Sequence, residues 1–146
     1  MNGKKIFEYA LDITKAADSG IALSDILSGA QAVPPQGLRI DVHFEGQASG
    51  DIAGHVYGVD YIQLRADGRI SLDIRAMIEV DAERRIAISA DGVGVVRDGK
   101  PMADLWENVS LTTAAPEYAW VNTKQIWSVG TVNFATGKIF LEAYAQ

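Results

Sequence analysis

Residues 58–75 read GVDYIQLRADGRISLDIR, and this stretch has the pattern of a β-hairpin. Polar and apolar residues alternate on either side of Asp67-Gly68. An Asp-Gly pair between two alternating runs is the strongest short-range signal of a tight type I′ turn, which needs positive φ at both central residues. The stretch therefore predicts two antiparallel strands joined by a two-residue turn.

Charged residues are placed inside this hairpin. Counting outward from the turn sets Ala66 opposite Arg69 and Asp60 opposite Arg75. Asp73 precedes Arg75 by two residues, so the two side chains share one face of the sheet. We therefore expect a guanidinium and two carboxylates to converge on one patch.

The same alternation recurs along most of the chain and favours an all-β fold. Gly, Asp-Gly, Asn and Pro separate the runs at the spacing of an antiparallel meander. With some eight or more strands, a single-domain antiparallel β-barrel over residues 1–146 is the economical architecture, because closure removes exposed edges. A sandwich is the second choice. The expected strands lie within 7–13, 38–45, 70–80, 85–90, 93–97, 106–113, 118–127 and 130–144.

Residues 14–36 do not follow the alternation. Ser24 can serve as an N-cap and Gly29 as a helix stop. One short helix or loop insertion is therefore expected near residues 21–30.

Composition limits the possible functions and partners. The 146 residues carry a net charge of −6 and no cysteine. An acidic chain without a basic patch argues against nucleic acid and anionic membrane surfaces as partners. The lack of cysteine excludes disulfides, a thiolate nucleophile and cysteine-ligated metals. Glu8 and Asp12 interrupt the first apolar run, so no signal peptide is expected and the predicted location is cytoplasmic.

The parity of the apolar residues changes near Gly58, where a bulge would exchange the two faces of the strand. With that bulge, one polar face forms across three strands. Two interpretations stay open: the face lines the barrel lumen, or it points to water as an exposed ion-pair surface. The face would carry Arg39, Asp41, His43, His55, Tyr57, Asp60, Asp73 and Arg75.

A second candidate site lies in the expected strand 118–127. Alternation would place Tyr118, Trp120 and Asn122 on one face, as an amphipathic ligand wall with three hydrogen-bonding groups. The alternative is a sheet surface packed under a loop.

The two histidines do not predict a metal site. His43 and His55 would be cross-strand neighbours if residues 47–51 form the loop, with Asp41 or Glu45 as a third ligand. A surface pair of histidines is favoured, and no metal ligand is assigned. The chain also has no phosphate-binding glycine loop, so no cofactor is expected.

Several short motifs in order resemble the DUF3237 (UPF0311) family of small bacterial proteins. The family's Gly-x-Asp-aromatic step is similar to residues 58–61, its Asp-Gly turn to 67–68 and its Leu-Asp-x-Arg strand to 72–75. Its Tyr-x-Trp-Leu-Asn segment resembles 118–122, with valine in place of leucine. The resemblance implies a β-barrel but no settled activity, and it favours the lumen site over the solvent-exposed face.

These observations lead to the hypothesis of a cofactor-independent acid–base enzyme of isomerase, lyase or hydrolase type. Its substrate would be a small, mostly apolar carbonyl compound inside the barrel cavity. Arg75 would bind the carbonyl oxygen, Asp60 or Asp73 would move the proton, and Tyr118 would act as a donor. The expected substrate-binding residues are Asn122, Trp120, Tyr57, His55 and Tyr61.

Two alternatives remain. The first is a non-catalytic barrel that binds a small molecule, since barrel mouths are common ligand sites. The second is a subunit of a homo-oligomer, in which exposed aromatic residues such as Trp106 and Trp127 would be covered.

Overall fold

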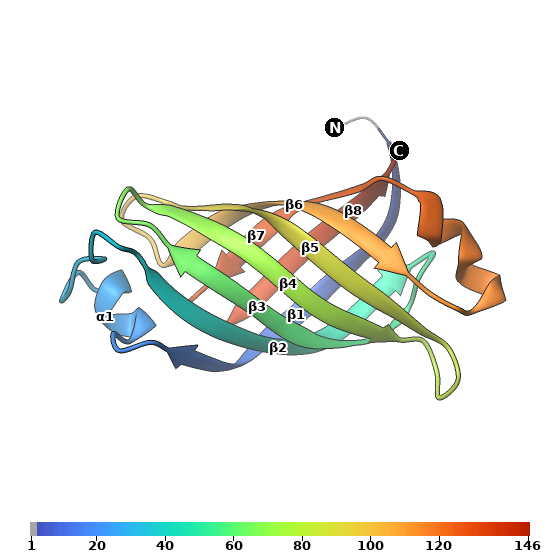
Figure 1. Ribbon diagram of the computed structural model, residues 1–146, viewed down its shortest axis with the longest axis horizontal. Coiled ribbons are helices and arrows are strands. Elements are labelled where there is room, and N and C mark those ends of the chain that lie inside the picture. The colour runs from blue at the N-terminus through green and yellow to red at the C-terminus, as the bar shows by residue number, and fades with distance from the viewer. Residues whose placement is uncertain (1–2) are drawn as a thin grey trace.

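The computed structural model describes residues 3–146 and shows a closed barrel of eight antiparallel strands (Figure 1). Each strand pairs with its neighbours in the chain, and β8 also pairs with β1, which closes the barrel. The barrel prediction is confirmed over the sandwich. The strands are β1 Lys4–Asp18, β2 Leu38–Gly50, β3 Gly54–Leu64, β4 Arg69–Glu79, β5 Arg85–Val96, β6 Met102–Thr112, β7 Ile126–Asn133 and β8 Lys138–Ala145.

Alternating side chains fill the barrel from every strand. Ile40, Val56, Ile78, Ile86 and Ile126 each have no more than 1% of their surface exposed. Burying one such side chain contributes roughly 1.5–3 kcal/mol. The period-2 pattern therefore sets both the strand identity and the inward face.

The two ends of the barrel are closed in different ways. At one end the 3-10 helix η1, Pro116–Thr123, lies across the opening (Figure 1). Its Val121 and the nearby Ile52 of the β2–β3 turn are fully buried, so this end is packed with apolar side chains.

The opposite end carries the short helix α1, Leu23–Leu27, which confirms the predicted helix near residues 21–30 (Figure 1). Ala22, and not Ser24, precedes its first turn, and no side chain caps it. Leu23 and Ile26 pack against the core, but the hydrogen bonds of residues 21–36 all stay within the segment 21–37. Side-chain packing alone therefore holds this segment on the barrel.

The β3–β4 hairpin differs from the predicted one by a single residue. Its turn holds three residues, 66–68, and Gly68 has a φ of +90°. This is the second common hairpin geometry, a type I turn followed by a left-handed glycine. Asp60 consequently pairs with Ile74, and the predicted pairing of Asp60 with Arg75 is wrong.

The predicted bulge at Gly58 is also absent. The β2–β3 register runs without interruption from Leu38↔Leu64 to Ala48↔Gly54. A Cβ on Gly58 would collide with the Arg75 carbonyl oxygen, so this glycine permits a close approach of two strands. The even-numbered residues of β3 therefore keep facing inward, and Asp60 is among them.

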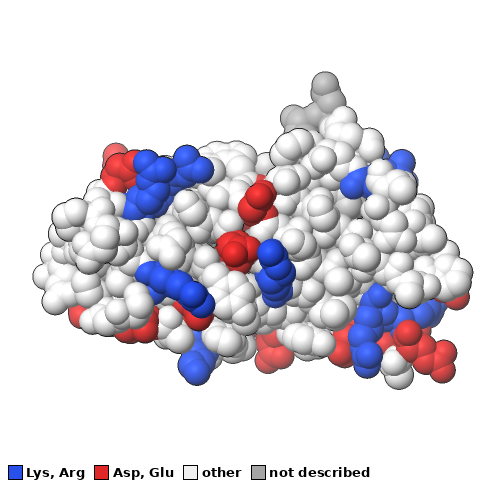
Figure 2. Space-filling model, in the orientation of Figure 1, with Lys and Arg blue, Asp and Glu red and all other residues white. Residues whose placement is uncertain are grey.

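The outer surface has apolar side chains as well as charged ones. Figure 2 shows charged side chains toward both ends of this face and a further group of acidic and basic side chains near its middle, with uncharged surface between them. Trp106 and Trp127 are exposed to 49% and 38% on the outside of the barrel. The homo-oligomer that would cover them stays a prediction. No helix within residues 3–146 has the length and apolar character needed to cross a membrane.

Candidate functional site in the barrel lumen

Asp60 is an acidic group on an otherwise apolar face. It follows Val56 on the inward side of β3 and precedes Ile62, both of which are buried. The whole residue is partly buried, and its carboxyl group lines the central cavity. Its Oδ1 accepts a hydrogen bond of 3.0 Å from the backbone N–H of Asp73. Burial raises the pKa of Asp60 to about 7; the hydrogen bond from the Asp73 N–H opposes this rise, and the negative charge of the Asp73 carboxylate adds a smaller increase.

Glu107 projects into the same space from β6. It lies on the inward face between Leu105 and Val109 and is only 4% exposed. Its Oε1 accepts a hydrogen bond of 2.9 Å from Ser128 Oγ on β7. Burial raises the pKa of Glu107 to about 8, and the Asp60 carboxylate contributes a smaller increase.

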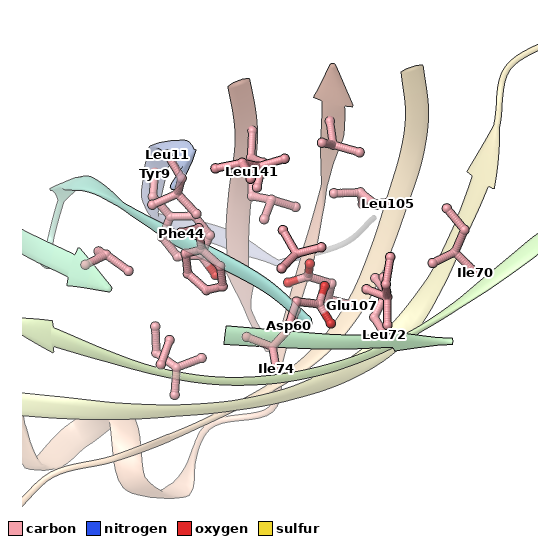
Figure 3. A pocket seen from close by; sticks show the side chains of 18 of the residues that line it. Tyr9, Leu11, Phe44, Asp60, Ile70, Leu72, Ile74, Leu105, Glu107 and Leu141 are labelled. Atoms are coloured by element: carbon pink, nitrogen blue, oxygen red, sulfur yellow. The ribbon is translucent and has the colours of Figure 1, made fainter. Parts of the chain in front are cut away.

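The two carboxyl groups lie side by side in the lumen (Figure 3). They line a narrow cavity of about 50 Å³, which has room for about three to five water molecules. Tyr9 also lines it. All other walls are apolar, and those labelled in Figure 3 are Leu11, Phe44, Ile70, Leu72, Ile74, Leu105 and Leu141.

Tyr9 completes the polar group. The residue is 4% exposed, and burial raises the pKa of its hydroxyl well above the usual range, so the hydroxyl keeps its proton. The nearby Ser128 hydroxyl opposes that rise in pKa. The Tyr9 hydroxyl is therefore a potential proton donor in the cavity that holds the carboxyl pair.

The two carboxyl groups titrate together because of this geometry. No Lys, Arg or His of the described chain lines the cavity, so no cation favours the ionised forms. Two adjacent buried carboxyls without a cation titrate as a coupled pair. Near neutral pH the pair therefore retains at least one proton, which the two carboxyl groups share.

The sequence-predicted trio is split by the barrel wall. Asp60 faces inward, whereas Asp73 and Arg75 project from the outer surface of β4, with side chains 57% and 61% exposed. Their ion pair, 3.0 Å long, is a surface pair that contributes about 0–1 kcal/mol. The prediction that all three share one lumen face is wrong, because the hairpin register differs by one residue and each such slip reverses the faces.

The predicted ligand wall is wrong as well. Tyr118, Trp120 and Asn122 belong to the 3-10 helix η1 rather than to a strand, so alternation does not apply to them. None of the three lines the lumen cavity. The Tyr118 ring lies 5.9 Å from the guanidinium of Arg84, and Trp120 is 37% exposed.

Asn122 has a structural role at this end of the barrel. Its Oδ1 accepts the backbone N–H of Thr113 at 2.8 Å, and its Nδ2 donates to the Thr113 carbonyl at 3.0 Å. These two bonds fix η1 to the end of β6. We expect Asn122→Ala to lower the free energy of unfolding by about 1–2 kcal/mol.

Urea unfolding measures this difference. Thr123→Ala, which removes an exposed neighbour without a side-chain hydrogen bond among the described residues, is the matched control and should change stability by less than about 0.5 kcal/mol. Equal effects of the two substitutions would contradict the anchoring role.

The remaining predicted binding residues lie on the outer surface. Tyr57 is 40% exposed, and its hydroxyl donates to Glu79 Oε1 at 3.1 Å. The Arg39 guanidinium lies 5.2 Å from the centre of the Tyr61 ring. Neither tyrosine lines the cavity, because the odd-numbered residues of β3 face outward.

The histidines are not neighbours. His55 pairs with Gln47 and His43 with Val59, so the predicted cross-strand pair is wrong. The His55 Nε2 atom instead lies 3.5 Å from Glu45 Oε2 on the outer surface. Within residues 3–146 no three metal-ligating side chains converge.

Sequence reasoning missed Glu107, Ser128 and Tyr9, although one signal was present. Residues 103, 105, 109 and 111 make an apolar face on β6, and Glu107 is the one charged residue with their parity. Asp60 interrupts the even-numbered apolar residues of β3 in the same way. An isolated acid on the apolar parity of a strand is the pattern that identifies this site.

The fold and the site together define a closed eight-stranded barrel with acidic groups in an apolar lumen. The family model described as "Protein of unknown function (DUF3237)" matches residues 29–145, so the chain belongs to this family. A search of the curated proteins found no significant match.

Solved structures with the same fold come from several bacteria. A protein of unknown function from Clostridium acetobutylicum ATCC 824 has a TM-score of 0.79 and 22% identity, covering 100% of this chain and 99% of its own. A conserved protein of unknown function from Rhodopseudomonas palustris has a TM-score of 0.76 and 16% identity, covering 99% and 95%. A β-barrel like protein from Acinetobacter baumannii AYE has a TM-score of 0.74 and 17% identity, covering 99% and 94%. At these identities the likeness shows the fold.

Proposed function

We propose that this barrel is a cofactor-independent acid–base enzyme that moves a proton on a small, mostly apolar carbonyl compound in its lumen. The observation that carries the proposal is the pair of lumen carboxyls, Asp60 and Glu107, which lie side by side in an apolar cavity where burial raises both pKa values. Paired groups whose environments separate their protonation states are typical of acid–base sites. An isomerase-type reaction fits this pair best, since one carboxyl group can remove a proton from the substrate and the other can stabilise the negative charge that develops on the substrate's carbonyl oxygen.

Asp60 is the proposed base. Its free oxygen, Oδ2, would take the proton from the carbon next to the substrate carbonyl, while Oδ1 keeps its hydrogen bond to Asp73 N–H. The electrons of the broken C–H bond then form a double bond to the carbonyl carbon, and negative charge develops on the carbonyl oxygen. Return of the same proton to another carbon of the conjugated system would complete an isomerisation without any co-reactant.

Glu107 is the proposed donor to that oxygen. Its Oε1 already accepts from Ser128, so its proton is placed on Oε2, which has no hydrogen-bond partner among the described residues. The protonated Oε2 can donate to the developing oxyanion, and the Tyr9 hydroxyl offers a further donor nearby. Preorganised donors in a dry cavity stabilise such charge strongly.

The test is deuterium exchange into small ketones. The protein is incubated in D2O with cyclohexanone and cyclohexenones, and deuterium next to the carbonyl is followed by mass spectrometry. We expect the protein to accelerate exchange and Asp60→Asn to lower the rate by about 10²–10⁴-fold.

Asp73→Asn is the matched control, since the Asp73 side chain lies outside the barrel while its backbone N–H still donates to Asp60, so the rate should stay far above that of Asp60→Asn. Equal exchange rates for Asp60→Asn and the unmodified protein would overturn the proposal. So would a ketone that binds in the lumen and shows no accelerated exchange.

A non-catalytic binding barrel is the second candidate, favoured by the apolar walls of the cavity. The barrel would then hold its ligand without altering it. Quenching of tryptophan fluorescence would saturate with ligand, and mass spectrometry would recover the ligand unchanged.

A further inference from the structure

The lumen differs from the surface in how its acidic groups are compensated. On the outside, many carboxylates are paired with basic residues, as in Arg97–Asp104 at 2.7 Å and Lys5–Glu142 at 2.7 Å. The chain has 13 Lys and Arg residues, yet none of those described lines the cavity that contains Asp60 and Glu107. Buried charges in proteins are ordinarily paired or hydrogen-bonded. A positive partner is therefore what this cavity lacks.

Each lumen carboxyl keeps one oxygen free for such a partner. Asp60 Oδ1 accepts the Asp73 N–H, and Glu107 Oε1 accepts the Ser128 hydroxyl. The second oxygens, Oδ2 and Oε2, have no hydrogen bond in the described chain. Glu107 is 96% buried (4% exposed), and its side chain points into the cavity beside Asp60 (Figure 3). When Glu107 is ionised, two acceptors thus face the same cavity.

The shape of the cavity restricts what the positive group can be. The cavity has room for about three to five water molecules, and its remaining walls are leucine, isoleucine, valine, alanine and aromatic side chains. A metal ion would need more ligands than two carboxyl oxygens and a phenol offer. An alkyl ammonium ion matches both the carboxyl pair and the apolar walls, because it combines three N–H donors with a slender apolar chain.

We propose that the lumen binds a small organic amine in its ammonium form, with the nitrogen between Asp60 Oδ2 and Glu107 Oε2 and the alkyl chain along the apolar walls. Charge-assisted hydrogen bonds are roughly twice as strong as neutral ones, so the ammonium is favoured over an alcohol of the same shape. A carboxylate of the same length is repelled by the acidic pair. The proposal uses the cavity of the proposed reaction and does not depend on catalysis.

The experiment compares three probes of equal chain length: pentylamine, pentanol and pentanoate. Binding to the full chain is measured by isothermal titration calorimetry at pH 8. We expect the dissociation constant of pentylamine to be at least tenfold lower than that of pentanol, and pentanoate to show no binding. Asp60→Asn and Glu107→Gln should each remove the preference for the amine, whereas Asp73→Asn should retain it.

Equal affinity for pentylamine and pentanol would overturn the proposal, as would an amine preference that survives in Asp60→Asn. Because circular dichroism checks the fold of each variant, lost binding is separated from lost structure. The two proposals also fail separately. Ketone exchange without amine preference removes only the amine site, and amine binding without ketone exchange removes only the proposed reaction.

Discussion

Neutralising both lumen carboxyls should stabilise the barrel by several kcal/mol at alkaline pH. In the folded protein, burial raises the pKa of Asp60 from 3.8 to about 7 and that of Glu107 from 4.5 to about 8. The folded state therefore binds more protons than the unfolded state between these values. The stability contributed by the two groups is fully present below about pH 4, falls as pH rises through 7 and 8, and is constant above. For each carboxyl group, the rise in pKa on folding lowers the free energy of unfolding by an amount on the order of 4 kcal/mol once the pH exceeds the pKa of the folded state.

The double variant Asp60→Asn/Glu107→Gln removes both titrations while keeping the shape of the side chains. Urea unfolding at pH 5 and pH 9 should show a large loss of stability for the unmodified protein and a smaller one for the variant. Exposed carboxylates such as Asp81, whose pKa is lowered to about 2 by Arg84, titrate in both proteins and cancel in the comparison. Parallel pH dependences in the two proteins would show that the lumen carboxyls are not responsible.

Replacing Gly92 by alanine should cost about 3 kcal/mol or more, the second large effect. Gly92 pairs with Glu107, and a Cβ at this position would collide with the backbone carbonyl oxygen of Trp106. Backbone atoms of a paired strand cannot turn aside as a flexible side chain can, so β5 and β6 must separate. That separation would also displace the Glu107 carboxyl from the cavity.

Gly94→Ala is the matched control on the same inward face of β5. Its Cβ would meet only side chains, Leu105 Cδ2 at 3.2 Å and Ile70 Cβ at 3.3 Å, so a cost of about 1 kcal/mol is expected. Thermal unfolding of both variants measures the contrast. A Gly92→Ala protein as stable as Gly94→Ala would mean that the strands approach less closely than described.

The fold was largely predictable from the sequence, because each strand carries a period-2 pattern that needs no distant partner. The register of the β3–β4 hairpin was not, since Asp67-Gly68 fits both a two-residue turn and the last two positions of a three-residue turn. A difference of one residue exchanges the two faces of the strand. The same alternating letters therefore predicted the strand correctly and its inward residue set incorrectly.

The site was predictable only in part. Asp60 was identified, but Glu107 and Ser128 are cross-strand partners on β6 and β7. Tyr9 on β1 reaches them only when β8 pairs with β1 and closes the barrel. The alternating Tyr-x-Trp-x-Asn pattern at 118–122 predicted a strand, but these residues form the 3-10 helix η1. Its true conformation depends on hydrogen bonds from Asn122 to Thr113, which a local pattern does not show.

The connection between β1 and β2 has a practical consequence. Residues 21–36 contribute no strand-pairing hydrogen bond to the barrel. The pairing of β1 with β2 and with β8 involves only residues outside this segment. A protease that cleaved this connection would leave two fragments associated in one barrel. The segment is therefore the natural place to insert a fluorescent reporter that senses whether the lumen beneath it is filled.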